Sequence, residues 1–156
     1  MKDLFEYLYS LRNRGSSFGL ERMEILVDLM GNPHTKFPVI HVAGTNSKGS
    51  VCSMLSSVYQ ENGYNVGLFT SPHLISLEER IKVNGEMISN EEIHEEIRFL
   101  KPIAEMMEKK TEGMHPTFFE FMTAVAFLFF KKKKSRFSHF RNRVGWSFGF
   151  YECSVS

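Results

Sequence analysis

A short apolar segment that leads into a glycine-containing polar loop, and then into a helical pattern, constrains this chain more than any other feature. Residues 37–43, FPVIHVA, are rich in β-branched side chains and have a proline near their start, as is typical of a buried parallel strand. Gly44 ends the segment, and residues 48–62 have the apolar spacing of a helix. Residues 66–69 predict a second strand. Together these elements form a βαβ unit, so the sequence predicts an α/β fold with a parallel sheet.

The rest of the chain up to residue 130 predicts mainly helices. Apolar residues at helical spacing predict helices at 3–12, 20–30, from Asn90 onward and at 117–130. Residues 80–88 alternate and contain Asn-Gly, which predicts a small hairpin. The acidic residues that follow Ser89 are expected to face solvent; they are Glu91, Glu92, Glu95 and Glu96.

Composition limits the classes of protein to consider. The chain has 156 residues, 42% hydrophobic and 24% charged, which suits one globular domain. Its sequence contains neither the roughly 18 apolar residues of a membrane span nor a signal peptide, so a cytoplasmic protein without a membrane partner is expected. Cys52 and Cys153 are far apart, so neither a disulfide framework nor a zinc site is indicated. Residues 131–156 hold 7 basic and 1 acidic side chains, a balance that could suit a nucleic-acid-binding arm.

The loop between the first strand and its helix is suited to phosphate binding. A turn at a helix N-terminus presents backbone N–H groups and the positive end of the helix dipole. Lys48 would add a cation, and the hydroxyl of Ser50 could reach phosphates or magnesium. The spacing differs from the standard P-loop pattern, because Lys48 follows Gly44 by four positions and precedes Gly49. The alternative is an ordinary strand-to-helix turn with an incidental surface lysine.

The letters of this loop resemble a known family. HVAGTNSKGS, residues 41–50, is similar to the HVAGTNGKGS signature of the folylpolyglutamate synthase family, part of the Mur ligase superfamily. Further segments agree in family order: FGLER (18–22), TSPHL (70–74), ERI (79–81), VNG (83–85) and TFFEF (117–121). Ser47 stands where the signature has glycine, and it carries a steric cost if the loop needs a positive φ there.

The resemblance implies a P-loop-type parallel sheet flanked by helices, like the central domain of Mur ligases, and an ATP-dependent ligation of L-glutamate to folate or dihydropteroate through an acyl phosphate. ATP and Mg²⁺ are the implied cofactors, and folate or dihydropteroate and L-glutamate are the implied small-molecule partners. We expect a monomer that does not bind nucleic acid. The residues that it implies for ATP are Thr45, Asn46, Ser47, Lys48, Gly49 and Ser50, and for magnesium Ser71. Those that it implies for the pterin substrate are Ser10, Leu11, Arg12, Asn13, Thr117, Phe118, Phe119 and Glu120.

Simpler interpretations compete with these assignments. Ser71 precedes a proline and could simply form a turn. Phe118 and Phe119 could be core residues. A buried Glu120 would need a partner or a function. No side chain is assigned as a catalytic nucleophile, because phosphoryl transfer depends mainly on positioning and charge neutralisation.

Residues 131–156 depart from the family pattern. The family would continue with a strand and a segment of the form LE-x-GLGGR-LDATN, and the sequence shows no clear periodicity there. Plausible codons from His139 onward, read one base later, encode ILETGLGGRLDSTN. We therefore expect a family portion at 1–130 and a frameshifted, non-family tail at 131–156, with the fold truncated and no ligase turnover. A non-catalytic nucleotide-binding fragment and another Mur-type amino-acid ligase are the alternatives.

Overall fold

The computed structural model describes residues 2–14, 20–44, 46–135, 137–141 and 151–155. The chain forms two compact units, and neither is a continuous segment. The helical unit comprises Met1–Pro33 and Asn90–Phe129, and the sheet unit comprises His34–Ser89 and Phe130–Ser156.

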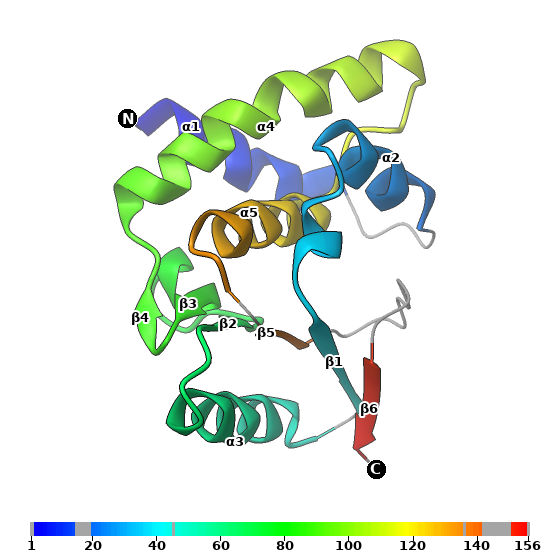
Figure 1. The fold of residues 1–156 in the computed structure, drawn as a ribbon. Coiled ribbons are helices and arrows are strands. Elements are labelled where there is room, and N and C mark those ends of the chain that lie inside the picture. The colour runs from blue at the N-terminus through cyan, green and yellow to red at the C-terminus, as the bar shows by residue number, and fades with distance from the viewer. Residues whose placement is uncertain (1, 15–19, 45, 136, 142–150, 156) are drawn as a thin grey trace. The chain divides into compact units, whose positions relative to one another are not determined.

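The helical unit contains four α-helices, as the apolar spacing predicts. They are α1 (Lys2–Ser10), α2 (Glu21–Leu29), α4 (Asn90–Lys110) and α5 (Phe118–Lys132). Helix α5 belongs to this unit up to Phe129. The 3-10 helix η1 (Leu11–Arg14) follows α1. The long helix α4 packs against α1 and α2 (Figure 1). The expectation that Glu96 faces solvent is wrong, because its position on the inner side of α4 leaves it 8% exposed.

The sheet unit is built on a six-stranded sheet in the order β4-β3-β2-β5-β1-β6 (Figure 1). Its strands are β1 (Val39–Gly44), β2 (Val66–Phe69), β3 (Ile81–Val83), β4 (Glu86–Met87), β5 (Phe137–Arg141) and β6 (Tyr151–Val155). Strands β2, β5, β1 and β6 run parallel, while β3 and β4 are antiparallel. The predicted parallel sheet is thus confirmed, with an antiparallel hairpin at one edge.

Helix α3 (Lys48–Glu61) connects β1 to β2 and packs along β1, β2 and β5 (Figure 1). Its inner face buries Cys52 and Ser56. The predicted βαβ unit is confirmed, but its two strands are not neighbours: β5 lies between them, pairing Val66 of β2 with Phe137 and Val39 of β1 with Ser138.

The hairpin between β3 and β4 turns at Asn84 and Gly85, whose φ angles are positive, 51° and 83° respectively. Two consecutive positive φ angles are the requirement of the tight hairpin turn that Asn-Gly favours. The Asn84 side chain also accepts a hydrogen bond from the Val66 amide at 2.8 Å, so the turn is fastened to the start of β2.

Gly67 allows an aromatic ring to pack closely on the sheet. A Cβ atom at this position would lie 2.7 Å from the ring of Phe130, which is completely buried. Phe130 also makes an edge-on contact with Phe37, with ring centroids 6.2 Å apart. Strand β2 therefore needs a residue without a side chain here, because the aromatic ring occupies the space.

Two strands follow residue 130, where the sequence shows no recognisable strand pattern. Strand β5 pairs with both β1 and β2, and β6 pairs with β1 from Ile40–Tyr151 to Gly44–Val155. The sequence predicts neither strand, because pairing with neighbouring backbones defines these strands and their side-chain pattern does not. No helix within the described part of the chain has the length and apolarity to cross a membrane.

Candidate functional site

The loop between β1 and α3 has the geometry of a phosphate-binding turn. Strand β1 ends at Gly44, which has a φ of 146°, and Ser47 adopts the left-handed conformation at φ 58° and ψ 2°. Helix α3 begins directly afterwards, and the Val51 amide donates the first helical hydrogen bond to the Ser47 carbonyl at 3.0 Å. The amides of the first turn have no carbonyl of their own helix to bond, so they can bind an anion.

Lys48 is held inside this turn. Its side chain is only 6% exposed, and its ammonium group donates a hydrogen bond to the carbonyl oxygen of Gly44. Lysine is rarely buried to this degree unless it has partners or a function. The alternative that Lys48 is an incidental surface lysine is therefore wrong.

The other residues assigned to ATP surround Lys48 in sequence and are accessible. Asn46, Ser47 and Ser50 are exposed and Gly49 is half-buried, while Thr45 lies outside the described residues. The loop thus combines open backbone amides with one enclosed cation. Such an arrangement can neutralise a chain of phosphates from one side.

Ser71 belongs to the loop that follows β2. Because β1 and β2 run in the same direction on either side of β5, the loops after both strands lie at the same edge of the sheet. Ligands of α/β proteins bind at this carboxyl edge. Ser71 is half-buried, lies in a bend of the chain and forms a cis peptide bond with Pro72.

Glu79 fixes the shape of the same loop. Its carboxylate accepts hydrogen bonds from the backbone amides of Leu74, Ile75 and Ser76, each at 2.8 Å. These bonds, with a smaller contribution from His73, lower the pKa of Glu79 to about 2, because they favour the charged form. Arg80, which is buried, donates to Nδ1 of His73 at 2.7 Å.

Magnesium is compatible with the hydroxyls at this edge. Mg²⁺ prefers oxygen ligands and commonly takes only one or two from the protein, with phosphates and water as the others. Ser50 and Ser71 offer such oxygens. Among the residues that the structure describes, no cluster of three or more His, Cys, Asp or Glu could hold a metal ion.

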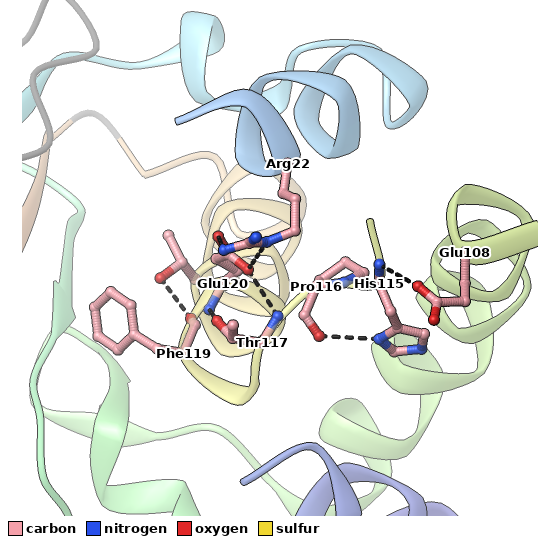
Figure 2. A network of polar contacts seen from close by, with 8 residues as sticks. Arg22, Glu108, His115, Pro116, Thr117, Phe119 and Glu120 are labelled. Carbon is pink, nitrogen blue, oxygen red and sulfur yellow. Dashed lines mark hydrogen bonds and ion pairs between the residues drawn. The ribbon is translucent and has the colours of Figure 1, made fainter. Parts of the chain in front are cut away.

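A second polar cluster lies in the helical unit, at the start of α5 (Figure 2). Glu120 is 1% exposed, and Arg22 of α2 donates to both of its carboxylate oxygens, each at 3.1 Å. The Thr117 amide donates to Glu120 Oε2 at 2.7 Å, and the Glu120 amide donates to Thr117 Oγ1 at 3.3 Å. The buried carboxylate thus has a partner, which sequence reasoning did not assign.

The residues that lead into this cluster are also tied down (Figure 2). The His115 amide donates to Glu108 at 2.8 Å, and His115 Nδ1 donates to the Pro116 carbonyl at 2.9 Å. Since Nδ1 carries that proton, Nε2 is free to accept the hydrogen bond from the Tyr7 hydroxyl at 3.0 Å. No local pattern in the sequence indicates these contacts, which join residues from two helices, α1 and α4, and the loop before α5.

The two segments assigned to the pterin substrate meet within the helical unit. The Arg12 guanidinium lies over the ring of Tyr9 at 4.6 Å and over the ring of Phe118 at 4.9 Å. The exposed Ser10 donates to the Tyr7 carbonyl at 2.6 Å.

The other members of these segments differ in accessibility. Leu11 is 1% exposed and belongs to the core. Phe118 is buried and Phe119 half-buried. The side chain of Asn13 lies outside what the structure describes. Arg12, Ser10 and Phe119 are therefore the members best placed to meet a ligand.

Comparison with known proteins identifies the family. The dihydrofolate synthase/folylpolyglutamate synthase of Bacillus subtilis is 42% identical over 148 residues, which are 94% of this chain and 34% of the relative. The crystal structure of folylpolyglutamate synthase from Thermotoga maritima matches with a TM-score of 0.84 and 38% identity, over 92% of this chain and 33% of that one. The chain belongs to the folylpolyglutamate/dihydrofolate synthase family.

Members of this family have also been solved with ligands. The Mycobacterium tuberculosis folylpolyglutamate synthase complexed with ADP has a TM-score of 0.84 and 30% identity, over 91% of this chain and 32% of that one. A folylpolyglutamate synthase complexed with AMPPCP and folate has a TM-score of 0.82 and 27% identity, over 93% and 35%. The chain thus spans about a third of the length of the relatives it matches. No family model matches it.

Proposed function

We propose that this chain contributes the nucleotide-binding part of an ATP-dependent ligase that joins L-glutamate to folate or dihydropteroate. The observation that carries the proposal is the geometry of the loop between β1 and α3. Ser47 is left-handed directly before α3 begins, and Lys48 is buried in the same turn. The names of the relatives and the ADP and AMPPCP complexes of similar proteins support it.

In this proposal the loop residues bind ATP and the protein supplies no nucleophile. The first-turn amides of α3 and the ammonium group of Lys48 bind the phosphates, and Lys48 leaves the Gly44 carbonyl to do so. Ser50 and Ser71 would hold magnesium, which neutralises phosphate charge. The terminal phosphoryl group of ATP passes to the substrate carboxylate, and the glutamate amine then displaces phosphate from the acyl phosphate to form the amide.

We place the folate or dihydropteroate contacts in the helical unit. Arg12, Ser10 and Phe119 would bind the substrate directly, since they are accessible. Glu120 would position the start of α5 through Thr117, because its oxygens are engaged by Arg22. The folate complex of a similar synthase supports a substrate of this class.

Calorimetric titration of the 156-residue chain with Mg-ATP tests the nucleotide site. We expect saturable binding that Lys48→Met weakens at least about tenfold, since a charge contact to phosphate contributes about 1.5–3 kcal/mol. Methionine keeps most of the buried volume, and circular dichroism verifies the fold. Lys109→Met, an exposed position on α4, is the matched control and should bind normally. Absence of heat at millimolar nucleotide with folded protein would contradict the proposal.

We also propose that residues 131–156 arise from a frameshift near Lys131–Lys134. The shifted codons that encode a family segment support it, as does the polar sequence of β5, FSHFR, in a central parallel position that normally takes a nearly continuous apolar run. The alignment with the Lacticaseibacillus casei relative covers 128 residues, a length that fits within 1–130. The alignment with the Bacillus subtilis relative covers 148 residues and therefore extends into the tail. Resequencing the locus decides: an uninterrupted frame with no overlapping GLGGR-type segment refutes the frameshift.

A further inference from the structure

A cleft of about 770 Å³ opens in the sheet unit, at the edge opposite the phosphate loop. It is lined by Lys36, Phe37, Pro38, Tyr64, Lys131, Lys134 and Ser135. These residues precede the parallel strands β1, β2 and β5 or lie at the end of α5, so the cleft is at the amino ends of the strands. We call it the amino-edge cleft. Its volume is within the range of about 300–1,000 Å³ that small-molecule sites occupy.

The amino-edge cleft is strongly basic. Lys36, Lys131 and Lys134 are exposed, and none of them forms an ion pair with another residue in the described ranges. No acidic side chain is among the lining residues. Three ammonium groups around one cleft repel each other, and a bound anion would relieve that repulsion.

A defined turn presents two of these lysines. Lys134 adopts a φ of 53°, its amide donates to the Lys131 carbonyl at 3.1 Å, and the Ser135 amide donates to the Phe130 carbonyl at 2.9 Å. These bonds satisfy carbonyls at the C-terminus of α5, where the helix dipole would otherwise disfavour an anion. The backbone that carries the lysines is therefore fixed before any ligand binds.

Ser135 gives an independent indication of a missing ligand. It is 5% exposed, and its buried hydroxyl has no hydrogen-bond partner among the described residues. An unsatisfied buried polar group costs about 1–3 kcal/mol, so an acceptor that reached this hydroxyl would be favoured. Tyr64 and Phe37 add aromatic surface to the same cleft.

We propose that the amino-edge cleft binds an organic phosphate: the lysines and Ser135 hold the phosphate, and the aromatic residues contact a flat apolar body. This site is separate from the loop around Lys48, because it lies at the opposite ends of the same strands. Three of its residues, Lys131, Lys134 and Ser135, belong to the segment 131–156, so the cleft is a property of the chain with the sequence given, whether or not a frameshift produced that segment.

Titration of the ¹⁵N-labelled chain with phenyl phosphate, and separately with inorganic phosphate, tests the proposal by amide shifts. Shifts of Tyr64, Lys134 and Ser135 report the amino-edge cleft, while shifts of Gly49 and Ser50 report the phosphate loop. The two sites, and hence the two proposals, can therefore fail independently. We expect saturable shifts at the cleft, with phenyl phosphate binding more tightly than inorganic phosphate.

Charge-removing variants decide whether the cleft is specific. Lys36→Gln with Lys131→Gln should weaken phenyl phosphate binding at the cleft about fivefold or more, as expected for two exposed charge contacts. Lys109→Gln with Lys110→Gln removes the same charge from α4 and should leave binding unchanged. The proposal would be overturned if both double variants weakened phenyl phosphate binding equally, or if Lys36→Gln with Lys131→Gln left it unchanged. Equal affinity of the cleft for phenyl phosphate and inorganic phosphate would also overturn it.

Discussion

Replacing Ser47 by glycine should stabilise the protein, although it removes a side chain from a helix boundary. Ser47 has a φ of 58°, a conformation that costs a residue with a Cβ atom roughly 1–2 kcal/mol. Its side chain makes no capping hydrogen bond, so its removal forfeits at most a few tenths of a kcal/mol. Glycine also destabilises the folded protein by roughly 0.5–1 kcal/mol, because it gives the unfolded chain more conformational freedom. The net gain is therefore about 0.5–1 kcal/mol.

Urea unfolding followed by circular dichroism measures this gain. The midpoint of Ser47→Gly should rise without a change in the slope, because the surface exposed on unfolding stays the same. Ser57→Gly is a matched control: it makes the same substitution at an exposed position inside α3, where glycine should cost about 0.5 kcal/mol. A loss for Ser47→Gly equal to that of Ser57→Gly would show that the loop is not left-handed at this residue, and the phosphate-loop geometry would then be incorrect.

Three further substitutions test other parts of the structure. Gly67→Ala should destabilise the protein by about 1–3 kcal/mol through overlap with Phe130, and Phe130→Leu in the same chain should recover part of that loss in chemical denaturation. Arg22→Met should cost about 3–5 kcal/mol because it leaves Glu120 buried without its partner, whereas a small loss would show that the pair is not buried in solution. Glu79 has a lowered pKa, so its contribution to stability is complete above pH 4.5 and disappears as the pH falls toward about 2. The stability difference between the unchanged protein and Glu79→Gln should therefore shrink over that window, and a difference independent of pH would contradict the assigned hydrogen bonds.

Elements with a strong local pattern could be read from the sequence. Strand β2 coincides with the predicted residues 66–69, and α3 begins at Lys48 as expected. The Asn84-Gly85 turn was predictable because its positive φ angles suit only a few residue types. In each case neighbouring residues contain the whole signal.

Contacts between distant residues could not be read in the same way. Arg22 and Glu120 are separated by 98 positions, and nothing near either residue indicates the other. Glu96 follows the acidic pattern of its neighbours, yet its angle around α4 places it inside. The strands β5 and β6 depend on pairing with β1, so their own side chains carry little information about them.

The insertion of β5 between β1 and β2 sets the order in which this sheet can be completed. While the ribosome has released only β1, α3 and β2, the two strands cannot pair with each other, because the place between them belongs to β5. Their facing backbone groups must remain hydrated until β5 is available. The sheet closes only when Phe137–Arg141 emerges, so the nascent chain exposes the facing edges of β1 and β2 while the residues between β2 and β5 are synthesised. Chaperone binding during translation would protect this interval, and slow codons between β2 and β5 would lengthen it.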